Sequence, residues 1–261
     1  MVFTYQKAEV HYFKTGQGKK ILLAFHGFGQ TKQSFQFFAK KLSIQYTVYS
    51  FDLFYHGLSF WHEGEKPLEK EFWNGLIREF LNQQNIDRFS LAGFSMGGKF
   101  SLAIFEAFPD RVDRLILIAP DGIKVNFWYK LATYPASIRK IFRAMVIKPV
   151  YFDNLVAFFS KTGLLDKSIV KFAKYQMDTR KKRRQVYYSW VVFRLLHFNM
   201  KNITSLLNQY SVQVDIFLGK YDNMITKKHL NKLINNLNDY KLYVLETGHN
   251  NLINEVADFM D

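Results

Sequence analysis

The sequence predicts an α/β protein with a mostly parallel sheet, helices on both faces of the sheet and an inserted all-helical segment. Short apolar runs of strand length alternate with stretches of helical spacing in both terminal parts of the chain. Between these parts, no strong strand pattern is found and several stretches are amphipathic at helical spacing. We therefore divide the chain into a first core part at 1–123, a helical cap insertion at 124–210 and a second core part at 211–261.

The first core part opens with two short strands of an antiparallel pair, at 3–10 and 11–14, and a turn at Gly16-Gln17-Gly18. Continuous apolar runs then mark strands buried on both faces, as in parallel sheets. These strands are expected at 20–25, 46–51, 88–91 and 114–119. Helices are expected between them, at 34–42, 67–82 and 99–108.

The remaining elements follow the same reasoning. Amphipathic patterns predict helices at 138–147 and 169–177 within the insertion. In the second core part, strands are expected at 212–219 and 241–245, and helices at 227–237 and 254–260.

The net charge of +14 is unevenly distributed along the chain. Residues 124–205 contain 17 lysines and arginines but only three acidic residues, and the rest of the chain is balanced. Such a shift in composition indicates a separate structural unit.

Other features of the composition exclude some classes of protein and of chemistry. The chain has no cysteine, so disulfides and thiolate chemistry are excluded. No apolar run approaches the length of about 18 residues that a membrane span needs, and the first residues lack the core of a signal peptide. We expect a cytoplasmic protein without a transmembrane segment. No recognition motif supports nucleic-acid binding despite the charge.

A nucleophile elbow is indicated by Gly93-Phe94-Ser95-Met96-Gly97, which lies where a buried strand turns into a helix. A serine on so tight a turn projects its hydroxyl outward, and glycine is needed two residues to either side because side chains there would collide. The motif alone is only suggestive, since an inert glycine-rich turn has the same pattern. Ser95 is the candidate nucleophile.

A serine nucleophile needs a base and a carboxylate that orients the base. Ligands of parallel sheets bind beyond the carboxyl ends of the strands, so both groups are expected directly after strands. His249 and Asp222 meet this test, in the chain order of nucleophile-elbow hydrolases. Asp121 also follows a strand and is the main rival for the acid.

The oxyanion of an acyl-transfer intermediate needs backbone donors. One is expected to be the N–H of Met96, directly after the nucleophile, and the second that of Phe28 in the loop after strand 20–25. His26 fits a structural role within this loop better than that of a base.

Together these residues resemble the α/β-hydrolase superfamily, in its capped, esterase-like branch. The resemblance is carried by His26-Gly27-Phe28-Gly29, Asp52…His56-Gly57…Ser59, Gly93-Phe94-Ser95-Met96-Gly97-Gly98, Pro109-Asp110-Arg111-Val112, Gly219…Asp222 and Gly248-His249. It implies an α/β-hydrolase fold with an eight-stranded, mostly parallel sheet, a helical cap after the sixth strand and a triad of Ser95, Asp222 and His249. The loop 52–59 matches a structural motif of the family, with Phe54-Tyr55 where relatives often have Pro-Gly, and we expect altered packing there.

The function expected from these residues is hydrolysis of a small-molecule carboxylic ester or thioester through an acyl-enzyme, without a metal or an organic cofactor. Two alternatives stay open. One is a non-hydrolytic member of the fold, either a lyase or a ligand-binding module. The other is a carrier-protein methyl-ester esterase of the biotin-pathway type.

The insertion gives less specific information about the substrate than the core motifs give about the reaction. Its basic cluster at 180–184 is either a solvated face or a surface that steers an acidic carrier protein, an anionic substrate or an anionic membrane toward the site. Its aromatic residues either line an acyl pocket or form the core of the insertion. These are Trp128, Tyr129, Tyr187, Tyr188, Trp190 and Phe193.

Overall fold

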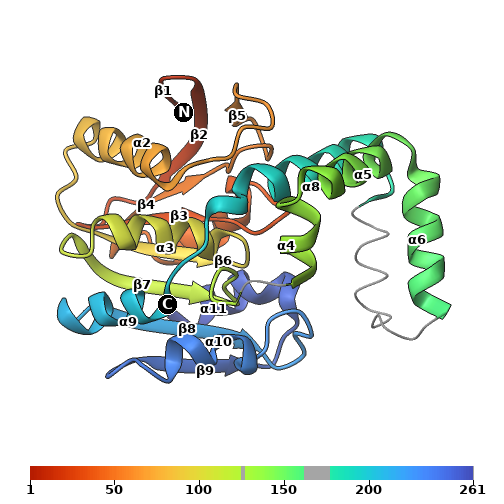
Figure 1. Cartoon of the computed structure of the whole chain (residues 1–261). Helices are drawn as coiled ribbons and strands as arrows, with labels where there is room; N and C mark the ends of the chain where they lie inside the picture. The colour runs from red at the N-terminus through yellow and green to blue at the C-terminus, as the bar shows by residue number, and fades with distance from the viewer. Residues whose placement is uncertain (125–126, 162–176, 261) are drawn as a thin grey trace. The chain divides into compact units, whose positions relative to one another are not determined.

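The computed structural model describes residues 1–124, 127–161 and 177–260, and within them one mixed sheet forms the centre of the fold (Figure 1). Its principal strands are β1 (Val2–Tyr5), β2 (Ala8–Thr15), β3 (Lys20–Phe25), β4 (Tyr46–Phe51), β6 (Phe89–Phe94), β7 (Val112–Ile118), β8 (Gln213–Gly219) and β9 (Lys241–Leu245). Their order across the sheet is β1-β2-β4-β3-β6-β7-β8-β9. Pairs from β4 onward are parallel, whereas β1, β2 and β4 are joined by antiparallel pairing.

The predicted fold class is thereby confirmed: the described residues place eight strands along this path. A further strand, β5 (Phe60–Trp61), pairs with β2 and was not predicted. Two residues are too few to produce a pattern of alternation, and β5 forms only because β2 offers it a free edge.

The division of the first hairpin was wrong. The chain turns at Gln6, whose φ of +50° is left-handed, and β2 runs without a break from Ala8 to Thr15. Ala8, Val10 and Tyr12 are all buried, so the same face of one strand continues through the point where the sequence was divided.

Helices cover both faces of the sheet (Figure 1). On one face lie α1 (Gln36–Lys41), which follows the 3₁₀ turn η1 (Lys32–Phe35), and α11 (Leu252–Met260). On the other lie α2 (Lys70–Gln83), α3 (Gly97–Ala107), α9 (Met200–Gln209) and α10 (Lys227–Ile234). Every residue of β6 is buried because the strand is covered on both sides, as its continuous apolar run predicts.

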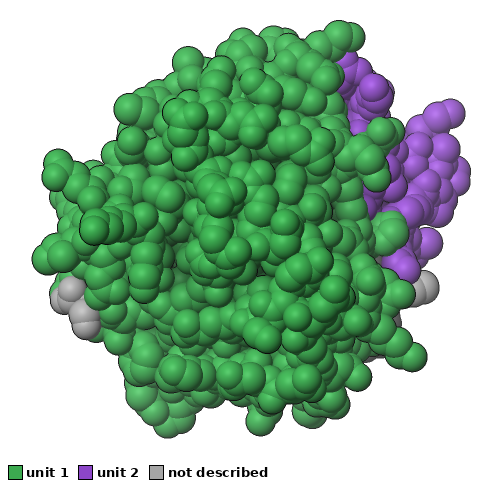
Figure 2. All heavy atoms as spheres, turned by 90° about the vertical axis from the view of Figure 1, so that its left-hand side faces the viewer, with its two compact units in different colours: residues 1–62, 69–124, 196–261 green, residues 63–68, 125–195 purple. Residues whose placement is uncertain are grey.

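The chain forms two compact units, which Figure 2 distinguishes by colour. The first unit comprises residues 1–62, 69–124 and 196–261, and the second comprises 63–68 and 125–195. The second unit is therefore shorter at its end than the proposed cap at 124–210. The reason is α9, whose buried Ile203 and Leu207 make it part of the first unit, where it packs against α3 and α10.

The second unit is helical in its described residues. It contains α4 (Phe127–Thr133), α5 (Ala136–Ile147), α6 (Pro149–Lys161) and α8 (Arg180–Val192). Helix α5 covers the predicted helix at 138–147, and the other predicted helix, at 169–177, lies outside the described residues except for Met177. No helix in the described part of the chain combines the length and hydropathy required to cross a membrane.

The aromatic residues of the second unit pack against one another. Tyr187 and Val191 of α8 form a buried cluster with Val146 of α5, and Phe142 packs against it. The ring of Trp190 lies 5.3 Å from that of Tyr129 and 5.6 Å from that of Phe142. These contacts form the core of the unit. Phe193 is also buried, and the side chain of Trp128 lies outside the described part.

The basic cluster 180–184 does not form one uniform surface. Arg183 is buried and donates to the carbonyls of Val146 and Met177, at 3.0 and 3.1 Å. Its guanidinium therefore ties the start of α8 to the end of α5. Lys182 pairs with Asp178 one turn away, at 3.1 Å. Arg183 thus has a structural role, and exposed charge in the cluster comes from its neighbours.

Candidate active site

Ser95 lies on the sharp turn between β6 and α3. Its φ of +48° is left-handed, a conformation that a residue other than glycine adopts only at a cost of about 1 kcal/mol or more. The turn is held by two backbone hydrogen bonds. The N–H of Ser95 donates to the carbonyl of Ile118 at 2.9 Å, and the carbonyl of Ser95 accepts from the N–H of Asp121 at 2.8 Å. The end of β7 therefore fixes the backbone of Ser95, whose side chain is partly exposed.

The flanking glycines are required by close contacts. A Cβ at Gly93 would lie 2.8 Å from the carbonyl oxygen of Gly97, across the turn, and a Cβ at Gly97 would lie 2.0 Å from that of Phe25. The collision expected across the elbow is thus present at Gly93. At Gly97 the tighter constraint comes from the neighbouring strand β3, which the sequence motif does not reveal.

His249 and Asp222 form a close pair. The Nδ1 atom of His249 lies 2.5 Å from Oδ2 of Asp222, and the Asp222 side chain is fully buried. The other carboxylate oxygen accepts from the N–H groups of Met224 and Ile225, at 2.7 and 3.0 Å. An ionised carboxylate only accepts, so Nδ1 carries the proton and Nε2 is left with its lone pair.

Several forces act on the ionisation of Asp222. Burial alone would raise the pKa of its carboxyl group, but the hydrogen bond and charge of His249, together with the N–H donors of Ile225 and Met224, outweigh burial and lower it. Asp222 therefore stays ionised at neutral pH, as an orienting carboxylate must.

The pair lies next to the elbow. The ring of His249 is 4.9 Å from that of Phe94, the residue directly before Ser95. Ser95 follows β6, Asp222 follows β8 and His249 follows β9, so all three lie beyond the carboxyl ends of parallel strands. The rival acid, Asp121, instead pairs with Lys99 at 2.8 Å and accepts from the N–H of Gly122.

Two backbone N–H groups are open for an oxyanion. Within residues 1–124, 127–161 and 177–260, neither the N–H of Phe28 nor that of Met96 donates to a protein acceptor. Met96 precedes the first residue of α3, so the partial positive charge of that helix adds to its N–H. Both N–H groups are therefore free to donate to an oxyanion, as the sequence predicts.

The loop that carries Phe28 is held by side chains. Gln30 accepts from the N–H of Gly27 at 3.1 Å. His26 lies 2.7 Å from the carbonyl of Gly27 through Nδ1, and its Nε2 accepts from the N–H of Leu53 at 3.0 Å. With both ring nitrogens engaged, His26 serves the loop and has no capacity left for proton transfer.

A family model described as alpha/beta hydrolase fold matches residues 20–256, which is most of the chain and both parts of its sheet. The chain belongs to the α/β-hydrolase fold family. Residues on both sides of the helical insertion thus belong to one family domain.

The curated relatives match only part of the chain. An uncharacterized protein of Mycobacterium tuberculosis is 34% identical over 126 residues, 46% of this chain and 35% of that protein. A pimeloyl-[acyl-carrier protein] methyl ester esterase of Legionella pneumophila is 28% identical over 158 residues, 55% of this chain and 62% of that protein. The chain thus spans well under the full length of these curated relatives.

A solved structure shows the same fold over nearly the whole chain. A thermophilic esterase from Thermogutta terrifontis superposes with a TM-score of 0.70, covering 97% of this chain and 92% of that one at 17% identity. At this identity the likeness concerns the α/β-hydrolase fold alone.

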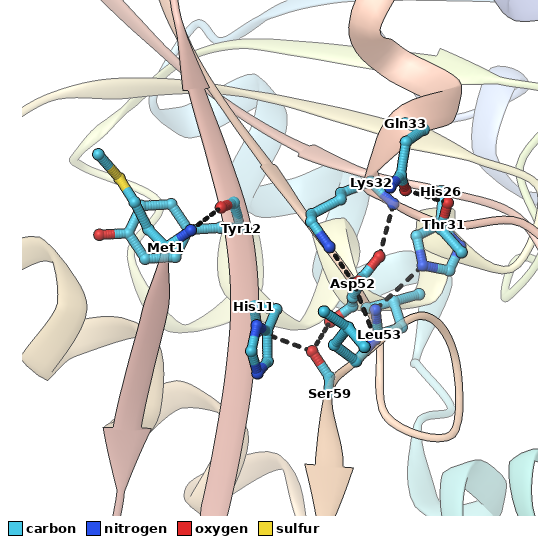
Figure 3. A network of polar contacts seen from close by, with 11 residues as sticks. Met1, His11, Tyr12, His26, Thr31, Lys32, Gln33, Asp52, Leu53 and Ser59 are labelled. Atoms are coloured by element: carbon cyan, nitrogen blue, oxygen red, sulfur yellow. Dashed lines mark hydrogen bonds and ion pairs between the residues drawn. The ribbon is translucent and has the colours of Figure 1, made fainter.

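The α/β-hydrolase motif at 52–59 surrounds a buried ion pair (Figure 3). Lys32 and Asp52 are both buried, and Lys32 donates to Asp52 from its ammonium at 2.6 Å and from its backbone at 2.7 Å. The carboxylate of Asp52 also accepts from the N–H of Leu58 at 3.0 Å, and its backbone carbonyl accepts from the hydroxyl of Ser59 at 2.7 Å. The sequence did not single out Lys32, because a lysine at the start of a helix is ordinarily exposed.

Asp52 is ionised in this pair. Burial would raise the pKa of its carboxyl group, but the hydrogen bonds and charge of Lys32 and the N–H of Leu58 lower it. The ion pair joins η1 to the loop after β4, and both elements adjoin the loop of Phe28.

Tyr55 stands where members of the family often have glycine. Its φ of +63° is the left-handed conformation that glycine adopts without strain, which explains the preference of relatives for glycine. Tyr55 adopts this conformation although it is not glycine, at a cost of about 1 kcal/mol or more.

Two buried histidines beneath the site predict a pH-dependent stability. Burial lowers the pKa of His26 to about 4 and that of His56 to about 3. Unfolded histidine titrates near about pH 6.5, so between about pH 6.5 and 4 the unfolded chain binds protons that the folded chain does not. The free energy of unfolding should therefore fall as the pH is lowered, by up to about 1.4 kcal/mol per pH unit for each histidine.

Urea unfolding at pH 7, 6 and 5 measures this slope. The variant His56→Gln should unfold more easily at pH 7, yet lose less stability between pH 7 and 5 than the parent does. Equal slopes for the variant and the parent would contradict a neutral, buried His56.

Proposed function

We propose that this protein is a serine hydrolase that cleaves a carboxylic ester or thioester. The observation that carries the proposal is the 2.5 Å pair of His249 and Asp222 beside the elbow that presents Ser95. Asp222 orients the imidazole so that Nε2 acts as the base, and the adjacent serine is the nucleophile. The open N–H groups of Phe28 and Met96 supply the donors for the oxyanion.

The first half of the reaction acylates the enzyme. The hydroxyl oxygen of Ser95 forms a bond to the carbonyl carbon of the substrate while its proton passes to Nε2 of His249. The carbonyl π electrons move onto oxygen, and the oxyanion accepts hydrogen bonds from Phe28 and Met96. When the carbonyl re-forms, the bond to the leaving alcohol or thiol breaks, and His249 returns the proton to that group.

The second half restores the enzyme. A water molecule takes the place of the leaving group, gives its proton to His249 and attacks the acyl carbon. The tetrahedral intermediate collapses, the bond to Ser95 breaks, and Ser95 regains the proton from His249 while the carboxylic acid departs. Asp222 stabilises the imidazolium that forms in each half and remains ionised throughout.

A second candidate is a carrier-protein methyl ester. It is supported by the relative from Legionella pneumophila, whose name states such a substrate, and by the basic residues of the second unit, which would attract an acidic carrier. A non-hydrolytic member of the fold is the contrasting alternative, because the same triad can serve a lyase and an inactive site can bind a ligand.

A substrate panel tests the proposal. It comprises p-nitrophenyl esters of increasing acyl length, acyl thioesters and a methyl ester carried on an acyl-carrier protein. We expect turnover of simple esters, with one acyl length preferred. Turnover confined to the carrier-linked ester would select the second candidate. No hydrolysis of any member by the folded protein would contradict a hydrolase and leave a lyase or a binding protein.

A further inference from the structure

Helix α5 of the second unit has apolar residues on two opposite faces. Phe142 and Val146, one helical turn apart, point into the buried cluster with α8. Lys140, Ile141 and Ile147 point away from that cluster, and Lys148 follows directly as the C-cap of the helix. A helix that packs with one face on a core has a polar outer face, so two isoleucines there are unexpected.

The outer isoleucines are well exposed. Ile141 is 53% exposed and Ile147 is 66% exposed. The chain then bends into α6, where Val150 is 53% exposed and Tyr151 is 46% exposed. We call Ile141, Ile147, Val150 and Tyr151, with Lys140 and Lys148, the α5–α6 corner. Four large apolar side chains are thus exposed within eleven residues of the chain, and apolar groups gathered at a surface mark interaction sites more often than single ones do.

Basic residues frame this patch. Lys140 of α5 and Lys148 directly after it are exposed, and the Lys148 ammonium lies 5.9 Å from the centre of the Tyr151 ring. Helix α5 contains no acidic residue. Arg143, on the same helix, pairs with Glu65 at 3.5 Å, and Asp153 on α6 is the nearby exposed acid. The balance of charge at the corner is positive.

We propose that the α5–α6 corner binds an anionic lipid surface. Apolar side chains flanked by lysines are the composition of a surface that lies in a membrane interface, where the apolar groups enter the boundary of the acyl chains and the lysines meet lipid phosphates. Lysine suits such a boundary because its alkyl chain can cover apolar surface while its ammonium stays in water.

The chemistry favours a lipid surface over an acidic protein. An acidic protein would satisfy the lysines, but it would have to present a matching apolar surface to cover Ile147, Val150 and Tyr151. A bilayer interface accepts both kinds of group without shape complementarity. The rest of the second unit adds positive charge, because residues 124–205 carry 17 basic and three acidic side chains. Long-range attraction to an anionic membrane would thus precede insertion of the corner.

Vesicle co-sedimentation of the full chain tests the proposal. We expect binding to vesicles of phosphatidylcholine with 30% phosphatidylglycerol, and binding at least about tenfold weaker to pure phosphatidylcholine. Raising the salt to 0.5 M should release most of the protein, because screening weakens the attraction of the lysines. Equal binding to both vesicles, or none to the anionic ones, would overturn the proposal.

Matched variants localise the contact. Ile147→Asp should weaken binding by more than about tenfold, since it removes an isoleucine that the membrane interface would bury and adds a charge of the wrong sign. Lys140→Glu and Lys148→Glu should each weaken binding at least about fivefold. The control is Ile44→Asp in the first unit, where Ile44 is 91% exposed.

The comparison of these variants decides the outcome. We expect Ile44→Asp to bind like the parent, and all four variants to keep the parent's melting temperature and ester turnover. If Ile147→Asp and Ile44→Asp bind the vesicles equally well, the corner is not the contact. If the parent ignores vesicles but an acidic carrier protein protects Ile147→Cys from a thiol reagent, the corner binds protein and the lipid proposal fails.

Discussion

Ser95→Ala is expected to lower kcat for ester hydrolysis by about 10⁵- to 10⁶-fold, with little change in KM. The substitution removes the atom that forms the acyl-enzyme, while the N–H groups of Phe28 and Met96 stay in place. Residual activity above the uncatalysed rate is expected from these donors alone. Turnover of the best p-nitrophenyl ester measures the effect.

Ser101→Ala is the matched control for this substitution. Ser101 lies on α3 just beyond the elbow, and its hydroxyl is buried without a hydrogen-bond partner in the described residues. Removing that hydroxyl should leave kcat within about twofold of the parent, because no interaction is lost. A Ser95→Ala variant that keeps more than a hundredth of the parent's kcat would contradict Ser95 as the nucleophile.

Asp222→Asn is expected to lower kcat by about 10⁴-fold. The asparagine oxygen can still accept from the N–H groups of Met224 and Ile225, so the loop should keep its shape. Its side-chain NH₂, however, would donate toward Nδ1 of His249 and favour the tautomer with the proton on Nε2. That tautomer cannot accept the proton of Ser95.

Asp121→Asn distinguishes this effect from a general loss of charge. Asp121 follows β7 as Asp222 follows β8, but it pairs with Lys99, whereas Asp222 holds His249. We expect Asp121→Asn to change kcat by less than about tenfold, since it only weakens a partly exposed ion pair. A larger loss in Asp121→Asn than in Asp222→Asn would reverse the assignment of the acid.

Three strands of the sheet could be predicted to the residue, whereas the strand expected at 88–91 runs from Phe89 to Phe94. The strands at 20–25, 46–51 and 241–245 begin and end where the sequence placed them. Apolar runs bounded by turn residues define such strands without reference to the rest of the fold. Elements that depend on distant partners were harder to predict from the sequence. β5 exists only as an addition to β2, and α9 joins the first unit because of what it packs against.

In the candidate site, too, locally encoded features could be predicted and those that depend on distant residues could not. The elbow is a local motif, so Ser95 and the need for glycine at 93 and 97 could be inferred from sequence. The sequence rule favoured Asp222 but left Asp121 as a rival, and the fold shows that Asp222 faces His249. The buried Lys32 could not be anticipated, because its partner Asp52 is 20 residues away.

The role of Arg183 was also beyond the reach of the sequence. Within a run of five basic residues nothing distinguishes the one that is buried, and its acceptors are carbonyl groups of other helices. Conversely, the exposed isoleucines of α5 fit the helical pattern of a core-facing stretch, and only the structure shows that they lie on its outer side.

The most direct test of the account is to locate a covalent adduct. The parent protein, treated with a fluorophosphonate and digested, should yield one modified peptide with the phosphonyl group on Ser95. Labelling should slow strongly in His249→Gln and vanish in Ser95→Ala. An adduct on another residue, or no adduct on the folded parent, would contradict the claim that His249 activates Ser95 at the end of this sheet.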